Sequence, residues 1–248
     1  ITCKQKITLK INGIGNYSIF YSDLEKVNAT YPDNITLNGI QLNESLTSFV
    51  NTTEENNTII LEWYNNSLKS CEKLFYNCSY ITDIDLSEFN SFAIQSTTKM
   101  FYDCKSLTSI NLTKFDMSNV KYMDYMFFGC SSLVSLYLYN FNTSFVEKIN
   151  NMFKGCNNLE YINFFNSVDI PIEDNKNIFK QLERNITFCF DNELYNKLNQ
   201  SNFPKNIYDL YHYNDDYNYI CYSENKECPK EYNKLIFNRK ECVKSCKD

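Results

Sequence analysis

The sequence contains very little glycine and histidine, and this scarcity excludes several kinds of functional site. Only five of its 248 residues are glycine, which leaves no glycine-rich loop to cradle a phosphate group. The single histidine, His212, has no serine or cysteine nucleophile motif near it. We therefore expect His212 to pack or to face solvent, and we expect neither enzyme activity nor a cofactor.

The chain also lacks an excess of basic residues and any long hydrophobic run. Its 24 Lys and Arg residues and 30 Asp and Glu residues give a net charge of −6, which argues against nucleic acid as a partner. No apolar run approaches the ~20 residues that a membrane span needs, so we expect no membrane span in this segment. The start at Ile1-Thr2-Cys3 shows no signal peptide and is typical of a processed or excised segment.

Signals for a metal site are equally scarce. No CxxC pair and no histidine partner accompany the repeated cysteines described below, so we expect no zinc site there. The acidic run Asn214-Asp215-Asp216 lacks the spaced oxygen ligands of a calcium loop, and we interpret it as a solvated turn.

What the sequence does contain is a repeat of 26 residues, which we call a rung. The pattern M-F-x-x-C begins at Met100, Met126 and Met152, and fainter copies begin at Leu74 and Ile178. A fixed step of this size is typical of proteins in which each repeat is one structural unit and the units stack on each other.

The first half of each rung predicts a β-strand. After each repeated cysteine comes an apolar pattern of the form L-x-x-L-x-L, and its last two apolar residues alternate as they do in a strand. The copies are Ile81/Ile84/Leu86, Leu107/Ile110/Leu112, Leu133/Leu136/Leu138 and Leu159/Ile162/Phe164. Stacked rungs would join these strands into a parallel sheet above a shared apolar core.

The second half of each rung predicts a short helix. In one copy, Val120, Met123, Phe127 and Cys130 are separated by 3, 4 and 3 positions, the spacing of one helix face over two to three turns. Ser118 and Ser144 precede this half as N-cap candidates. The slot at its end holds residue types that tolerate left-handed backbone, namely Asn77, Asp103, Gly129 and Gly155.

These patterns together predict an α/β solenoid, a leucine-rich-repeat stack of short parallel strands and short helices. Four repeated cysteines would form a column inside it, namely Cys78, Cys104, Cys130 and Cys156. We interpret them as small buried free thiols, in preference to disulfides or a redox site, because their neighbours are apolar.

The run from Phe115 to Leu138 resembles the BspA-like leucine-rich-repeat family, the 26-residue surface-protein repeat of bacterial and protist cell surfaces. Its matching pattern is F-x-x-S-x-V-x-x-M-x-x-M-F-x-G-C-x-x-L-x-x-L-x-L, and the resemblance covers about residues 69–165. The resemblance implies a secreted or cell-surface protein with an adhesion or surface-coat role and no catalysis, but it does not supply a ligand. Pro171 and Leu182 depart from the pattern, which indicates that the array ends there.

The flanks predict two further units. Residues 1–57 form a β-rich N-terminal cap, residues 58–188 form the solenoid, and residues 189–248 form a small cysteine-rich C-terminal module. In the cap, Asn12-Gly13 and Asn38-Gly39 each predict a hairpin between alternating apolar runs. The disulfide candidates of the C-terminal module, whose pairing stays open, are Cys189, Cys221, Cys228, Cys242 and Cys246. Cys71 is expected to be a core residue.

Sequons for N-glycosylation are more frequent than chance predicts. With 36 Asn and 36 Ser plus Thr, about five N-x-S/T triplets would be expected, and twelve are present. They begin at Asn16, Asn28, Asn34, Asn43, Asn51, Asn56, Asn65, Asn77, Asn111, Asn142, Asn185 and Asn199. We expect glycosylation in a secretory pathway, although an Asn-rich composition alone would also raise the number.

The outward positions of the predicted sheet form a candidate binding face for proteins or carbohydrates. They are Asp83, Asp85, Ser109, Asn111, Ser135, Tyr137, Tyr139, Tyr161, Asn163 and Phe165. Aromatic residues there suit recognition, but a glycan on Asn111 would obstruct a flat ligand. Either Asn111 is bare and the face binds a partner, or the working surface lies elsewhere; a solvated face without any ligand is the third possibility.

The sequence therefore favours a non-catalytic, N-glycosylated extracellular surface or coat protein whose partners are other surface proteins or glycans. The alternative is a structural subunit of an extracellular filament, in which copies self-associate head to tail. An enzyme is the least supported reading, because no acid–base pair stands on a recognisable motif.

Overall fold

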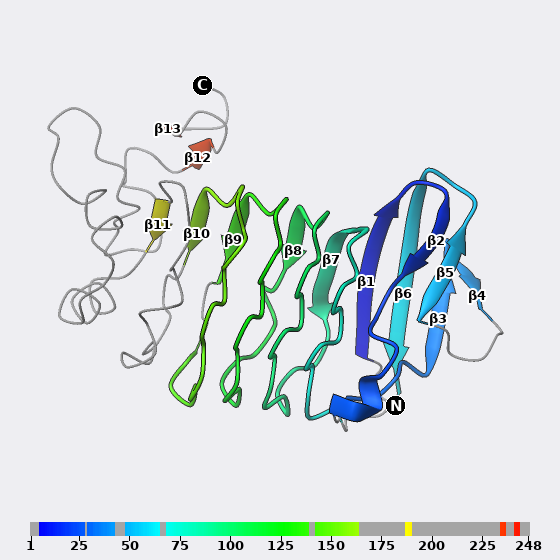
Figure 1. Ribbon diagram of the computed structural model, residues 1–248, viewed down its shortest axis with the longest axis horizontal. Coiled ribbons are helices and arrows are strands. Elements are labelled where there is room, and N and C mark those ends of the chain that lie inside the picture. The colour runs from blue at the N-terminus through cyan, green and yellow to red at the C-terminus, as the bar shows by residue number, and fades with distance from the viewer. Residues whose placement is uncertain are drawn as a thin grey trace, which may run out of the picture.

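The computed structural model describes residues 5–27, 29–42, 48–64, 68–138 and 142–163, and the backbone of three later strands (Figure 1). The described residues form strands, turns and one short 3-10 helix, η1 (Leu24–Val27). The strands before the rungs are β1 (Gln5–Asn12), β2 (Gly15–Ser18), β3 (Asn34–Leu37), β4 (Ile40–Gln41), β5 (Phe49–Thr52) and β6 (Asn56–Trp63). The strands that follow are β7 (Ile81–Glu88), β8 (Ser109–Asn111), β9 (Ser135–Tyr137), β10 (Tyr161–Asn163), β11 (Thr187–Cys189), β12 (Lys234–Ile236) and β13 (Glu241–Val243).

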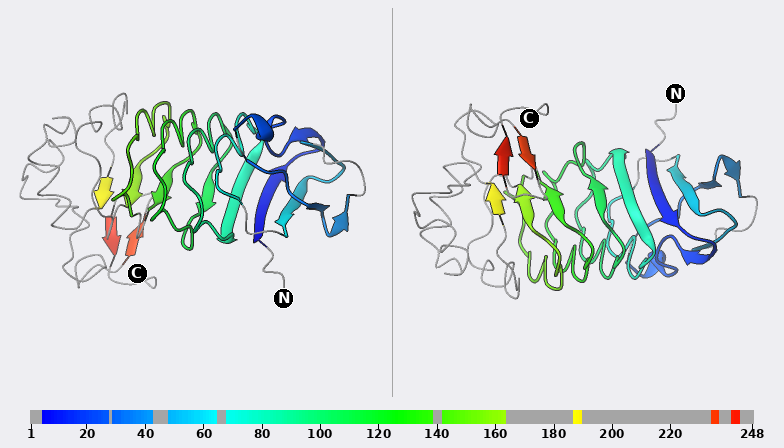
Figure 2. Two further views of the ribbon diagram at one scale, coloured as in Figure 1. Left: turned by 90° about the horizontal axis from the view of Figure 1, so that it is seen from below. Right: turned by 90° about the horizontal axis from the view of Figure 1, so that it is seen from above.

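The rungs stack with a constant register of 26 residues. β7 pairs in parallel with β8, so that Asp83 lies opposite Ser109. β9, β10 and β11 also pair in parallel, with Ser135 opposite Tyr161 and Tyr161 opposite Thr187. The expected stacking of the repeats is therefore confirmed. Figure 2 shows the strands along one side of the stack and irregular chain along the other.

The cap continues the sheet of the first rung. The strand order is β4-β3-β6-β1-β7-β8, and β1 runs antiparallel to both β6 and β7. Ile7, Leu9 and Ile11 on β1 are fully buried, while the residues between them face outward. The boundary that we expected between residues 57 and 58 falls inside β6, because this strand belongs to the cap sheet.

One of the two predicted hairpins forms and the other does not. β3 and β4 pair across Asn38 and Gly39, whose φ angles of 49° and 82° are those of the tight turn that this dipeptide favours. The chain also turns at Gly13, but β2 leaves β1 and pairs with β5 instead. The prediction of a hairpin at Asn12-Gly13 is therefore wrong, because β6 and β7 already occupy both edges of β1.

The expected short helices are absent from the described residues, so the α/β class is wrong for them. Residues 70–77, 96–103, 122–129 and 148–155 instead form consecutive turns, which we call the turn ladder. Alternate N–H groups in one rung donate to carbonyls of the next, as from Phe101 to Met126 at 2.9 Å and from Asp103 to Phe128 at 2.7 Å. The remaining N–H groups close turns within the rung, as from Tyr102 to Lys99 at 3.2 Å.

Left-handed residues are what keep the turn ladder from becoming a helix. Two residues four positions apart have positive φ in each rung, and in the third rung they are Tyr125 at 58° and Gly129 at 72°. An α-helix tolerates no such residue in its interior. Ser118 is likewise no N-cap: its N–H donates to Asp116 Oδ1 at 2.8 Å, which makes a local turn. Positive φ in the slot of Asn77, Asp103, Gly129 and Gly155 was expected and is confirmed.

The apolar face that suggested a helix is nevertheless buried. Phe75, Phe101, Phe127 and Phe153 are fully buried and stack on one another, with ring centroids 5.8, 5.2 and 5.9 Å apart. Parallel-offset stacking of this kind adds to the free energy gained from burying each ring. The core therefore runs through the stack as columns of equivalent residues.

Candidate functional site

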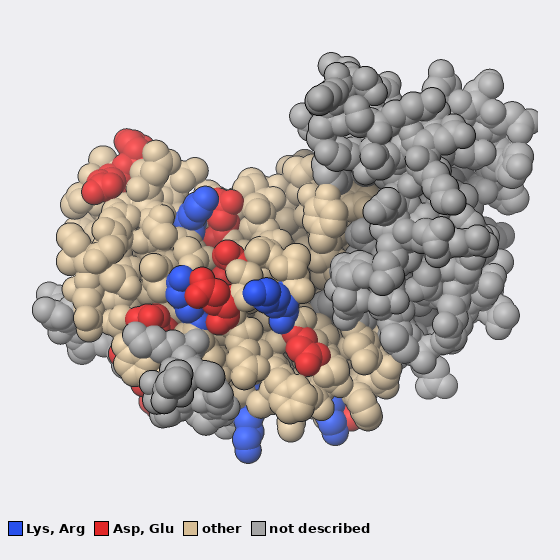
Figure 3. Space-filling model, turned by 180° about the vertical axis from the view of Figure 1, so that it is seen from behind, with Lys and Arg blue, Asp and Glu red and all other residues tan. Residues whose placement is uncertain are grey.

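The outward face of the sheet is charged near the cap and aromatic further along. Acidic and basic side chains gather where β1 meets β7 (Figure 3), and there Lys6 Nζ lies 2.8 Å from Glu88 Oε1 and Lys10 lies opposite Asp83. On β9, the ring of Tyr137 is 42% exposed. This face offers polar groups at one end and a partly exposed ring at the other.

The structure brings several residues of the expected binding face to the surface but not all of them. Asp85 and Ser109 are exposed, and Asp83, Asn111 and Ser135 are half-buried. Tyr161 is only 5% exposed, so our expectation of an outward ring is wrong there. Its strand lies between β9 and β11, and its ring centroid is 5.5 Å from that of Tyr137. Tyr139, Phe165 and the side chain of Asn163 lie outside the described residues.

Asn111 is tied into the sheet face by its own side chain. Its Nδ2 donates to Asp85 Oδ1 at 3.0 Å, and its Oδ1 accepts from the hydroxyl of Thr113 at 2.8 Å. Partial burial opposes ionisation of Asp85, but hydrogen bonds from Ser87 and Asn111 and the nearby Lys6 outweigh it and lower the pKa of this carboxyl. The sequon of Asn111 thus occupies the same face as the candidate binding residues.

The sequon asparagines that the structure describes all reach the surface. Asn16, Asn51, Asn56 and Asn77 are exposed, and Asn34, Asn111 and Asn142 are half-buried. The other five, Asn28, Asn43, Asn65, Asn185 and Asn199, lie outside the described residues. By contrast, Asn57, which is not itself a sequon asparagine, is 2% exposed, with Nδ2 donating to the carbonyl of Glu54 at 2.7 Å. The four exposed asparagines are therefore the most accessible sites for a sugar, whereas at Asn34 and Asn111 the Nδ2 atom donates to Glu62 and Asp85.

A second surface, which sequence analysis missed, runs along the turn ladder. The rings of Tyr76, Tyr102 and Phe128 occupy one slot in three successive rungs and stack with centroids 4.9 and 4.6 Å apart. Lys99 Nζ lies 5.9 Å from the ring centroid of Tyr102, and Lys154 Nζ lies 5.9 Å from that of Phe128. We call these five residues the ring–lysine stripe. The signal that could have found it is one aromatic residue at the same place in three rungs.

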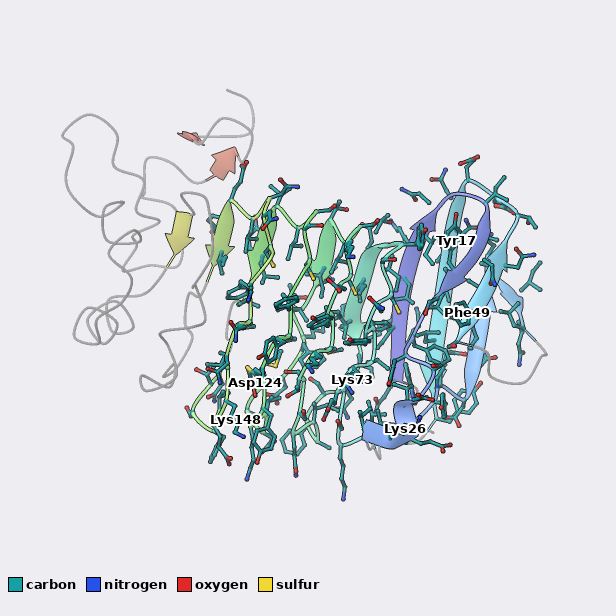
Figure 4. The ribbon with its side chains drawn as sticks, viewed as in Figure 1. Tyr17, Lys26, Phe49, Lys73, Asp124 and Lys148 are labelled. Carbon is teal, nitrogen blue, oxygen red and sulfur yellow. The ribbon has the colours of Figure 1, made fainter. Side chains whose placement is uncertain are left out.

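The charge along this surface is mixed rather than strongly basic. Figure 4 shows Lys73, Asp124 and Lys148 on the turn side of the stack, and Asp124 Oδ1 accepts from the backbone N–H of Asn150 at 2.7 Å. Because the rings of the stripe stack on one another, they turn their edges rather than their faces to solvent. The stripe suits contact with a protein better than stacking of a sugar.

The repeated cysteines form the expected column of buried free thiols. The thiol of Cys104 donates to the carbonyl of Phe75 at 3.1 Å, and Cys156 donates to Phe127 at 3.0 Å. Burial raises the pKa of the Cys78 and Cys156 thiols to about 12, so they stay protonated and unreactive at neutral pH. Cys71 is also buried and free.

Two of the five disulfide candidates lie on described strands. The backbone of Cys189 belongs to β11 and that of Cys242 to β13, which pairs with β12. Cys221, Cys228 and Cys246 lie outside the described residues, as does His212. Within the ranges described above, no three His, Cys, Asp or Glu side chains gather as metal ligands would, and no helix is long and apolar enough to cross a bilayer.

Comparison with known proteins gives a family match over the repeats. Residues 43–163, just under half of the chain, match a family model described as "Mycoplasma protein of unknown function, DUF285". One similar solved structure is a leucine-rich-repeat protein of T. pallidum, which is 17% identical, covers 56% of this chain and 80% of its own, and has a TM-score of 0.34. A score this low supports no structural conclusion, so the repeat architecture rests on the strand registers above. No curated protein matches the sequence significantly.

Proposed function

We propose that this chain is an N-glycosylated extracellular surface protein of the BspA-like leucine-rich-repeat type, and that it works by adhesive contact rather than by catalysis. The observation that carries the proposal is the excess of sequons together with their positions. Twelve are present, and of the seven in the described residues four have an exposed asparagine and three a half-buried one. A secretory pathway would make use of such sites, and sugars would cover much of the surface.

Adhesion needs a surface that sugars leave open, and two surfaces compete for this role. The sheet face holds Tyr137, but Asn111 lies in the equivalent place on β8, one rung earlier. A glycan on Asn111 would stand beside that ring. Beside the ring–lysine stripe, the exposed sequon asparagine Asn77 follows Tyr76 at its first ring, while Tyr102 and Phe128 in the next two rungs have no sequon next to them. We favour the stripe as the adhesive surface if Asn111 is glycosylated, and the sheet face if it is not.

The filament alternative gains less support. The outer edge of the cap sheet is β4, which has two residues, and short edge strands give a second copy few backbone groups to pair with.

The test is the mass of the intact chain secreted from a eukaryotic host, measured before and after enzymatic removal of N-glycans. We expect a loss of mass that corresponds to several sugars, and peptide mapping would then show which sequons carried them. A chain whose mass does not change would contradict the proposal. Tyr137→Ala and Tyr102→Ala variants would then be compared in their binding to cultured cells or to a glycan array. The variant that binds less would show which surface makes the contact.

A further inference from the structure

The two-stranded sheet of the cap presents an exposed ring beside two sequons. β2 and β5 pair antiparallel, with Asn16 opposite Asn51 and Ser18 opposite Phe49. Phe49 is 50% exposed and Asn51 is exposed, while Val50 and Thr52 between and after them are buried. Phe49 and Asn51 therefore share the outward face of β5.

The spacing places the Phe49 ring within reach of a sugar on Asn51. Residues two apart on one strand are separated by about 6.6 Å, and a sugar joined to Asn51 Nδ2 would lie above the strand at that distance. Across the β2–β5 pair, Asn16 lies directly opposite Asn51 and is therefore the diagonal neighbour of Phe49, at about 7–8 Å. Thr53, the third residue of the Asn51 sequon, is also exposed. Figure 4 shows Phe49 on β5 next to β2.

The strand that carries both residues is held firmly in place. Thr52 is 1% exposed, and its hydroxyl donates to the carbonyl of Gly13 at 2.8 Å while it accepts from the N–H of Gly15 at 3.0 Å. A fixed backbone of this kind keeps Phe49 and Asn51 at a constant separation. The backbone positions of the pair are thus pre-organised, and packing of a sugar there would order only the side-chain and sugar torsions.

We propose that the first sugar of an N-glycan on Asn51 packs against the ring of Phe49 and stabilises the cap. The first sugar of such a glycan, N-acetylglucosamine, has a face of C–H bonds with partial positive charge, which the negative face of an aromatic ring attracts. Packing there also removes exposed apolar surface from water. The inference rests on the proposed function, because it needs the chain to be glycosylated, and it gives one glycan a structural role.

The experiment is a double-mutant cycle of Phe49→Thr and Asn51→Gln in the secreted glycoprotein, with all other sequons intact. The readout is the folding equilibrium constant from urea unfolding, followed by fluorescence of Trp63, the single tryptophan, which is 2% exposed in the cap. Loss of the Asn51 glycan should lower this constant about five-fold when Phe49 is present. In the Phe49→Thr background the same loss should change it less than about two-fold.

Two further variants separate packing from a general effect of the sugar. Phe49→Tyr keeps an aromatic ring and should keep the coupling. Phe92→Val removes a ring that is 65% exposed and lies outside every sequon, creates no new sequon, and should leave the effect of the glycan unchanged. Enzymatic release of the Asn51 glycan from the native chain should also become faster in the Phe49→Thr variant, because the sugar is then no longer held against a ring.

The outcomes distinguish this inference from the proposed function. Equal effects of the glycan with and without Phe49 would overturn the inference and leave the glycosylated surface protein standing. An empty Asn51 in a chain whose other sequons are occupied would do the same. Only a chain without sugar on any sequon would overturn both.

Discussion

Replacement of Gly155 by alanine tests how tightly adjacent rungs are packed at the left-handed slot. Gly155 has φ +81°, and a Cβ atom there would lie 3.3 Å from both the N and the Cα atoms of Gly129 in the preceding rung. Both atoms are backbone, so they can move away only if the rung itself shifts. The substitution should therefore combine a backbone penalty with a packing penalty.

Gly39 provides the matched control, because its φ of +82° is nearly the same and a Cβ atom there would meet nothing within 4 Å. A left-handed alanine costs about 1–2 kcal/mol. The smaller entropy of the unfolded alanine chain offsets about 0.4–1 kcal/mol of this penalty. We therefore expect Gly39→Ala to lower the free energy of unfolding by about 1 kcal/mol. Overpacking against Gly129 should add about 1–3 kcal/mol for Gly155→Ala.

The assay is urea unfolding of the two variants and the parent chain, followed both by circular dichroism and by fluorescence of Trp63. Coincident curves from the two probes would justify a two-state analysis, which a stacked repeat protein does not always satisfy. The reasoning predicts a larger loss for Gly155→Ala than for Gly39→Ala. Equal losses would refute it, because they would show that adjacent rungs yield to a Cβ atom without resistance.

Three other predictions concern the core of the cap and the stack. Phe127→Ala should lower the free energy of unfolding by about 3–5 kcal/mol in urea unfolding, because it removes a ring that is fully buried between two others. Asn57→Ala should cost about 1–3 kcal/mol, since a buried amide with several hydrogen bonds is lost, whereas Asn12→Ala, at an exposed asparagine outside every sequon, should change stability by less than about 0.5 kcal/mol. Burial raises the pKa of the Cys104 thiol, so the unfolded chain loses this proton near pH 9 while the folded chain keeps it. The contribution of this thiol to the free energy of unfolding should therefore be complete below about pH 9 and decrease as the pH rises further. Above about pH 9, Cys104→Ser should make the decrease in the free energy of unfolding smaller by about 1.4 kcal/mol per pH unit. An unchanged slope in the variant would contradict the conclusion that this thiol is buried and protonated in the folded chain.

The sequence predicts the stack because the same residues recur at one spacing. Leu107, Leu133 and Leu159 are each fully buried, as a shared core between equivalent positions requires. A repeat of constant length leaves only one register in which every apolar residue meets its copy. The β3–β4 hairpin could also be predicted, because Asn38 and Gly39 adopt the left-handed backbone that the turn needs.

The sequence could not predict the turn ladder, because its hydrogen bonds join residues that are far apart in the chain. Phe101 donates to Met126, which is 25 residues away, whereas a helix would have used a carbonyl four residues back. Consecutive turns of about four residues bury apolar residues at the same spacing of 3, 4 and 3 positions as a helix does, so this spacing does not distinguish the two structures. The sequence also could not reveal the second left-handed position of each rung, because lysine and tyrosine are ordinary helix residues. This position is held by Lys73, Lys99, Tyr125 and Asn151.

Strand alternation predicts which side chains of the binding face point away from the core, but it does not predict their contacts with neighbouring rungs. Alternation correctly placed Asp85 and Tyr137 outside, but it could not show that Tyr161 would pack beside Tyr137 and be buried. Contacts of this kind depend on neighbouring rungs rather than on the strand itself. The same limit hid the ring–lysine stripe, whose members become neighbours only when the rungs stack.

The direction of the hydrogen bonds in the turn ladder bears on how the chain could assemble. Each rung donates its alternate N–H groups to the carbonyls of the following rung, so the first rung is left with carbonyls that need donors. A stack without caps would have free carbonyl groups at its first rung and free N–H groups at its last rung. Such ends would be complementary, and head-to-tail contact between copies would satisfy both. The cap removes that possibility at the first rung, because the N–H of Tyr21 donates to the carbonyl of Leu74 at 2.9 Å and β1 covers the edge of β7. A filament built through this rung contact would have to displace the cap and its buried Ile7, Leu9 and Ile11, which is a far larger loss than one rung contact could offset.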